Sequence, residues 1–251
     1  MPLTSCLLVV VGGAVLSPAM QSIRSRIASP RLRVILASAA VVFFAAIAVV
    51  RAADVVTNYH YLAERNLSTF GGGLSGWFPR RAAEFIHDQN LPGEVFNTYS
   101  EGGYILWALG PERRDYIDGQ ETPFGSLLQH EADMRSAPLD SEAWQKEADR
   151  YGINTIIFPL TMDEVSLARL NSDCRSRQWR PVYFDEVSII LVRRTPATED
   201  LIRRFEVDCA TAPLPRDPLP LNAASFNQWI DAARILSALG RNSRWPPPTK
   251  R

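Results

Sequence analysis

Residues 154–158 read Asn-Thr-Ile-Ile-Phe, and this stretch decides the fold class. A short, nearly continuous apolar run is typical of a strand buried on both faces, as in a parallel sheet. The segment before it, 142–151, is predicted to be a helix that Gly152 ends, and residues 163–170 are predicted to be a second helix. The sequence therefore predicts a strand between two helices, which is the pattern of an α/β domain.

The same alternation extends outward on both sides of this strand. Further helices are predicted at 79–90, 104–109 and 124–136, and further strands at 94–98 and 114–118, with a break at Gly102-Gly103. Two more strands, 179–184 and 187–193, are predicted to form a hairpin around Asp185-Glu186. Residues 79–196 are therefore expected to form a soluble α/β domain of two or three layers around a mixed sheet.

Residues 34–50 form an apolar run without any charge, VILASAAVVFFAAIAVV. About 17 to 20 such residues are needed to cross a bilayer. A helix on the surface of a soluble protein would show a polar face, and this run has none. Residues 3–20 form a second uncharged stretch, weakened by glycines and a proline. Residues 1–53 are therefore expected to be a membrane region with one or two transmembrane helices, in contact with a lipid bilayer.

Arginines between these two stretches predict the orientation of the chain. Arg24, Arg26, Arg31 and Arg33 lie there without any acidic residue. Short basic loops stay cytoplasmic, so the later helix is expected to run outward. A single anchor with a basic tail would predict the same side. The expected location is the inner membrane, with the soluble domain on the extracytoplasmic side.

Two segments flank the α/β domain. Residues 54–78 are interpreted as a connecting segment, with glycines at 71–73 that match no phosphate-binding loop. Residues 197–251 begin with a proline-rich linker and continue into an apolar helix at 223–239. This helix is similar to the first helix of a tetratricopeptide unit. The ending SRWPPPTKR is expected to be a truncated or frameshifted end.

Composition narrows the range of functions. The chain has 27 basic residues (Lys and Arg) and 27 acidic residues (Asp and Glu), so its formal net charge is zero. It lacks the net positive charge that would favour nucleic acid as a partner. The three cysteines, Cys6, Cys174 and Cys209, lack metal-ligand spacing, so neither a metal nor a cofactor is predicted. Cys174 and Cys209 are expected either to pair in an oxidising compartment or to remain free thiols.

Polar residues cluster between 97 and 125, after two predicted strands. Carboxylates and an amide at adjacent strand ends are what a sugar or metal pocket would need, and this cluster would form an acceptor or substrate surface. The candidate residues are Tyr99, Glu101, Gly103, Tyr104, Asp118, Gln120 and Glu121. A purely structural interpretation stands beside this one. The glycines would then form turns, and Tyr104 and Trp107 would belong to the core.

The segments EVFNTYSEGGYILWAL and RDYIDGQETPFG resemble the extracytoplasmic C-terminal domain of polytopic membrane proteins similar to the GT-C glycosyltransferases, which use lipid-linked sugars. A more distant likeness is to the catalytic subunit of oligosaccharyltransferase. Residues 99–103 would stand at its Trp-Trp-Asp-Tyr-Gly motif, but both tryptophans are missing here. The resemblance implies a lipid-linked sugar or a protein acceptor as partner.

The external loop that carries the catalytic acids of GT-C enzymes is missing from this sequence. The resemblance therefore implies a domain of a transferase-like protein that does not transfer sugar alone. Two other hypotheses remain open. The chain could be a membrane-anchored protein-interaction module, or a glycoside hydrolase that uses Glu101 and Asp118 as its two carboxylates.

Overall fold

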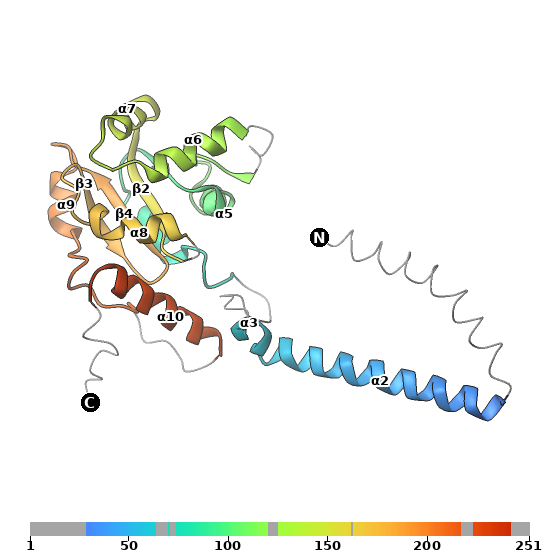
Figure 1. Cartoon of the computed structure of the whole chain (residues 1–251). Coiled ribbons are helices and arrows are strands. Elements are labelled where there is room, and N and C mark those ends of the chain that lie inside the picture. Colours follow the sequence, from blue (N-terminus) through green and yellow to red (C-terminus); the bar gives the residue numbers. More distant parts are fainter. Residues whose placement is uncertain are drawn as a thin grey trace. The chain divides into compact units, whose positions relative to one another are not determined.

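The computed structural model describes residues 29–63, 70, 74–119, 125–161, 163–216 and 223–241. The chain divides into two compact units, Met1–Thr57 and Asn58–Arg251. Figure 1 labels helices and strands of both units.

In the described part of the first unit, residues 29–57, the chain forms one long helix, α2, which spans Pro30–Val56. The Ser29 side chain caps its N-terminus, and Pro30 occupies the first turn, where its missing N–H costs nothing. Among the described residues, α2 is the one helix that is long and apolar enough to cross a membrane, as predicted for 34–50. The second predicted span, 3–20, lies outside the described residues.

The second unit is built on a four-stranded mixed sheet with the order β1-β2-β4-β3. The strands are β1 (Glu94–Phe96), β2 (Ile153–Pro159), β3 (Trp179–Phe184) and β4 (Ser188–Arg193). Strands β1 and β2 are parallel, and the other two pairs are antiparallel. The predicted central strand and the predicted hairpin are thus confirmed. The edge strand β3 has a register shift between Pro181 and Tyr183.

Helices cover both faces of this sheet, so the unit has three layers. The helices on one face are α4 (Arg80–Asp88), α5 (Tyr99–Leu109) and α9 (Glu199–Phe205). Those on the other are α6 (Gly125–Ser136), α7 (Glu142–Tyr151), α8 (Glu164–Asp173) and α10 (Ala223–Ala238). An apolar core lies on each face of the sheet, and alternate residues of β2 point into each. Ile157 packs against the first group of helices, and Ile156 and Phe158 pack against the second. This alternation explains the continuous apolar run.

Three predictions about local structure are wrong. Residues 114–118 form no strand, and α5 runs through Gly102 and Gly103 instead of starting after them. Helix α9 lies in a region expected to be a linker. Helix α10 confirms the predicted helix at 223–239, and it packs into the core through Ala232 and Ile235 beside the short helix α3 (Tyr59–Ala63).

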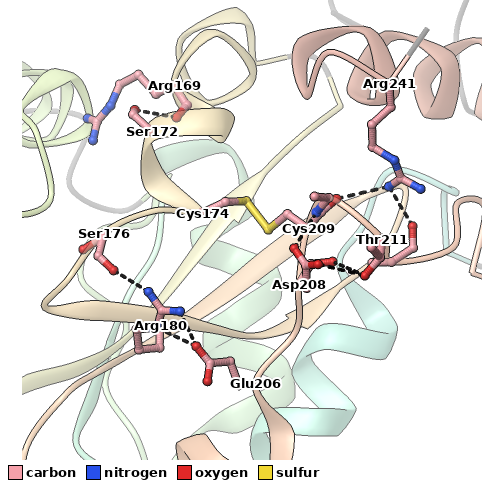
Figure 2. The surroundings of a disulfide bond; sticks show 12 residues. Arg169, Ser172, Cys174, Ser176, Arg180, Glu206, Asp208, Cys209, Thr211 and Arg241 are labelled. Carbon is pink, nitrogen blue, oxygen red and sulfur yellow. Dashed lines mark hydrogen bonds and ion pairs between the residues drawn. A yellow bond between two sulfur atoms is a disulfide. The ribbon is translucent and has the colours of Figure 1, made fainter. Parts of the chain in front are cut away.

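Cys174 and Cys209 form a disulfide, which resolves the alternatives that the sequence left open. The bond joins the C-terminus of α8 to the segment that follows α9 (Figure 2). Arg241, beyond α10, donates hydrogen bonds to the carbonyl oxygens of Cys209 (3.1 Å) and Ala212 (2.8 Å). The disulfide therefore lies where α8, α10 and this segment converge.

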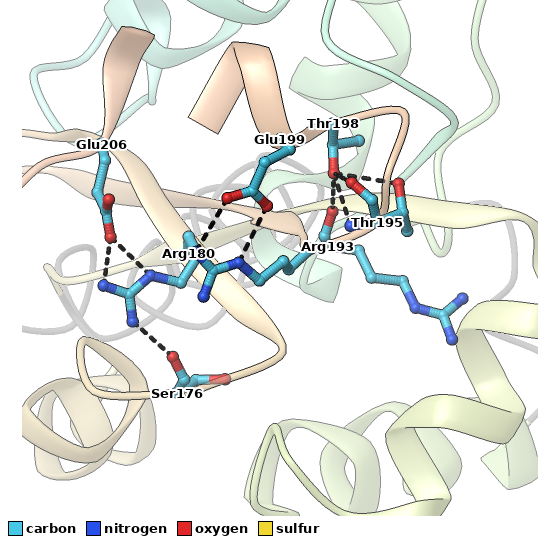
Figure 3. Close-up of polar contacts among 8 residues, drawn as sticks. Ser176, Arg180, Arg193, Thr195, Thr198, Glu199 and Glu206 are labelled. Atoms are coloured by element: carbon cyan, nitrogen blue, oxygen red, sulfur yellow. Dashed lines mark hydrogen bonds and ion pairs between the residues drawn. The ribbon is translucent and has the colours of Figure 1, made fainter. Parts of the chain in front are cut away.

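Polar contacts attach α9 to the β3–β4 hairpin (Figure 3). Arg180 of β3 pairs with Glu206, and Arg194 pairs with Glu199 at 3.1 Å. The Thr198 hydroxyl lies 2.6 Å from the Arg193 carbonyl oxygen and accepts from the Thr195 backbone N–H. These contacts fix the segment that carries Cys209 against the sheet.

Candidate functional site

The carboxyl ends of the parallel strands β1 and β2 lie at the same edge of the sheet, where ligands gather in open α/β folds. Glu101 lies there, in the first turn of α5, and is only 3% exposed. Its carboxylate accepts a hydrogen bond from the Thr98 hydroxyl. Burial raises the pKa of Glu101 to about 7, although hydrogen bonds from Thr98 and Ser100 act to lower it. Glu101 therefore changes charge near neutral pH.

Asp163 adds a second buried carboxylate to this edge, at the N-terminus of α8. It caps the helix by accepting from the Val165 N–H (3.1 Å) and the Ser166 hydroxyl (2.6 Å). Arg135 of α6 pairs with it at 3.0 Å. The negative charge of Asp163 also contributes to the raised pKa of Glu101. The two carboxylates thus interact electrostatically across the ends of β1 and β2.

Glu131 of α6 lies beside Arg135 in the same buried region. Burial raises the pKa of Glu131, and Arg135 opposes that shift. Glu131 Oε1 and Arg135 Nε are 3.4 Å apart, and both lack a hydrogen-bond partner among the described residues. Sequence reasoning missed Glu131, Arg135 and Asp163, because only the folded chain brings α6 and α8 to the edge where Glu101 lies.

The segment 116–118 reaches this edge without being a strand. The Asn97 amide donates to the Ile117 carbonyl oxygen at 2.8 Å, and its oxygen accepts from the Tyr116 N–H at 2.8 Å. Gly102 packs directly against this segment, since a Cβ at Gly102 would lie 1.9 Å from the Ile117 carbonyl oxygen. Glu101 and Asp118 are thus on adjoining segments, although residues 114–118 do not form the predicted second strand.

The predicted site residues differ in how accessible they are. Tyr99 and Gly103 are exposed, whereas Asp118 is buried at 7% exposure. Tyr104 is buried in the core, as the structural interpretation predicted. Trp107, which the same interpretation placed in the core, is instead 71% exposed. Gln120 and Glu121 lie outside the described residues.

A second buried acidic pair closes the β3–β4 hairpin, and sequence reasoning missed it as well. Asp185 accepts from the backbone N–H groups of Val187 and Ser188, both at 2.8 Å, and from the Tyr183 hydroxyl at 2.6 Å. Glu186 pairs with Arg81 of α4. The sequence signal that could have revealed this buried pair was the position of two adjacent acidic residues in a very short turn. The partners named here belong to the fold itself, so these contacts stabilise the hairpin and attach it to α4.

Glu101 and Asp163 are both buried carboxylates. Within the described part of the chain, no three His, Cys, Asp or Glu side chains group together as a metal site would require. The Glu101 carboxylate is buried and hydrogen-bonded, so a substrate atom has no direct path to it. Comparison with protein-family models, with curated proteins and with solved structures finds no match to this chain.

The raised pKa of Glu101 predicts a pH-dependent stability. The unfolded side chain titrates near 4.5 and the folded one near 7. Between these pH values the folded state keeps a proton that the unfolded state releases, so the free energy of unfolding falls as pH rises. Titration of Glu101 alone is expected to lower the free energy of unfolding by about 3 kcal/mol across this pH range. Urea unfolding curves from pH 4.5 to 8 measure this fall.

The variant Glu101→Gln isolates this contribution, because burial also raises the pKa of Glu131, Asp173 and Asp185. The variant should lose less stability than the wild type as pH rises. Glu142→Gln, on an exposed position of α7, is the matched control and should follow the wild type. Parallel curves for Glu101→Gln and the wild type would contradict the assignment.

Proposed function

We propose that this chain is a membrane-anchored, extracytoplasmic recognition domain of a GT-C-like, glycosyltransferase-related protein, and that it transfers no sugar alone. The observation that carries the proposal is the Cys174–Cys209 disulfide in the unit that follows the apolar helix α2. Disulfides persist mainly in oxidising compartments outside the cytoplasm. The arginines before and within the first turn of α2 support the same orientation, in the inner membrane.

The recognition surface in this proposal is the edge around Glu101. Exposed Tyr99 and Gly103 border it, and Asp118 adjoins it. Gln120 and Glu121 follow directly in the sequence and belong to the proposal. A lipid-linked sugar or a protein acceptor would contact the exposed rim, while buried Glu101 holds the first turn of α5 in place. The enclosed carboxylate supports recognition over hydrolysis.

The location is tested by fusing alkaline phosphatase or green fluorescent protein to the C-terminus of the full chain in a bacterium. The phosphatase fusion should be active and the fluorescent fusion dark. In the same cells, a maleimide reagent should label Cys174 and Cys209 only after reduction. A bright fluorescent fusion, together with labelling before reduction, would contradict the proposed side.

The recognition role is tested by placing a photo-crosslinking amino acid at Tyr99. The matched control position is Tyr151, another exposed tyrosine, on α7. Cells are grown with a radiolabelled hexose and irradiated, and the chain is purified under denaturing conditions. Labelled adducts at position 99 but not at position 151 are expected. Unlabelled protein adducts at 99 would favour the protein-interaction module, and equal adducts at both positions would rule out this surface.

A further inference from the structure

A cavity of about 410 Å³ lies between α4 and α5, toward the C-terminal end of α5. Its lining includes Ala83 and Ala108, small residues that let the two helices approach each other, together with Tyr104. Trp107 and Leu74 are the large exposed apolar residues of the lining. Small-molecule pockets have volumes of about 300 to 1,000 Å³ and mostly apolar walls, so this cavity falls within their range.

Aromatic rings form a continuous row that ends at this cavity. Trp77 stacks on Phe78 at 4.0 Å between ring centroids, Phe78 lies 5.1 Å from Tyr104, and Tyr104 lies 5.6 Å from Trp107. Trp107 contacts the row through Tyr104 and is nonetheless 71% exposed. With Leu74 it places a large apolar surface beside the cavity in contact with solvent. Exposed apolar surface at the border of a cavity favours a binding site.

Polar residues of α4 form the rim of the cavity. Arg80 pairs with Glu84 at 2.9 Å, and the His87 ring lies 3.1 Å from the Asp88 carboxylate. Burial and the nearby Glu84 carboxylate raise the pKa of Tyr104, so its hydroxyl stays protonated and can donate. The rim therefore offers both donors and acceptors, from one guanidinium, two carboxylates and an imidazole ring.

We propose that this cavity is a binding site for a neutral saccharide, whose pyranose ring stacks on Trp107 while its hydroxyls reach Arg80 and Glu84. Such a ring has an apolar C–H face and a hydroxyl edge, and each hydroxyl both donates and accepts. A charged ligand would have to displace the Arg80–Glu84 pair or the His87–Asp88 contact, whereas a neutral hydroxyl can add hydrogen bonds beside them. A wholly apolar ligand would desolvate the charged rim without replacing its hydrogen bonds.

This site is separate from the edge around Glu101, and it does not rest on the proposed function. Glu101 lies in the first turn of α5, and Trp107 lies near the end of the helix. If crosslinking at Tyr99 yields no sugar-labelled adduct, the proposed function loses support, but saccharide binding at Trp107 is unaffected. If no saccharide binds at Trp107, the proposed surface around Glu101 is likewise unaffected.

The test uses the full chain in phosphatidylcholine nanodiscs, because glycoside detergents would compete for the site. The protein carries 5-fluorotryptophan, and the Trp107→Phe variant assigns the fluorine resonance of Trp107. The probes are methyl β-D-glucoside, methyl β-D-galactoside, methyl α-D-mannoside and N-acetylglucosamine. At least one should shift the Trp107 signal saturably, with a dissociation constant on the order of 1 mM. Buried Trp144 and Trp179 should not shift.

Variants connect the binding to the residues of the cavity. Trp107→Ala, followed by calorimetry, should weaken binding about tenfold or more, and Glu84→Gln should weaken it several-fold. Tyr151→Ala removes an exposed aromatic side chain from α7, away from this cavity, and should leave the affinity unchanged. The proposal is overturned if no probe gives a saturable shift, if Trp107→Ala binds like the wild type, or if indole or inorganic phosphate binds more tightly than every sugar.

Discussion

Gly102→Ala is expected to lower the free energy of unfolding by about 3 kcal/mol, whereas Gly103→Ala is expected to raise it by about 0.5 kcal/mol. A Cβ on Gly102 would lie 1.9 Å from the Ile117 carbonyl oxygen and 2.7 Å from the Asp118 Cα. Both atoms belong to the backbone, which Asn97 holds in place, so the clash has no simple relief. Gly103 has open space around its Cα, and alanine is the better helix former.

Urea unfolding of the full chain, followed by tryptophan fluorescence, measures both variants. All six tryptophans follow residue 57, so the signal reports on the second unit alone. The neighbouring glycine serves as the control, because both substitutions add the same methyl group to the same helix. Equal stabilities for the two variants would show that α5 does not pack against 117–118 as described.

Removing the disulfide is expected to lower the free energy of unfolding by about 3 kcal/mol. The bond closes a loop with a sequence separation of 35 residues, which holds β3, β4 and α9. Without the cross-link, the unfolded chain regains the conformational freedom that this closure removes. The double variant Cys174→Ser/Cys209→Ser should therefore unfold at a lower urea concentration than the oxidised wild type.

Cys6→Ser is the control for the removal of the disulfide, since it replaces the remaining cysteine and leaves the Cys174–Cys209 bond intact. The reduced wild type should behave like the double variant. If reduction and the double substitution both leave the urea midpoint unchanged, the Cys174–Cys209 bond contributes nothing to stability. The loop closed by the bond would then not limit the conformational freedom of the unfolded chain as argued.

Local patterns in the sequence were enough to predict much of the sheet. The apolar run at 154–158, the hairpin around Asp185-Glu186 and the left-handed Gly152 (φ 69°) all appear in the structure. Each depends on residues near one another in the chain. The sequence left two or three layers open, and the structure has three, because helices cover the apolar strand on both faces.

The errors arise where distant residues decide the structure. Residues 114–118 look like a strand, but the Asn97 side chain supplies the hydrogen bonds that a strand neighbour would make. Helix α5 is apolar along most of its length, yet Trp107 lies at its exposed side. Asp163, the buried carboxylate that interacts electrostatically with Glu101, stands at the start of α8 and pairs with Arg135 of α6, so no local pattern could reveal it.

The two outer strands of the sheet also affect how the domain behaves at high concentration. An unpaired strand edge invites pairing with another molecule, which leads to aggregation. Here β1 is only three residues long, and β3 carries Pro181 and a register shift, while the Pro181 carbonyl oxygen accepts from the Val207 N–H at 2.8 Å. A domain carried by α2 on a membrane would be concentrated in two dimensions. Short and interrupted edges would keep neighbouring copies from joining into a continuous sheet.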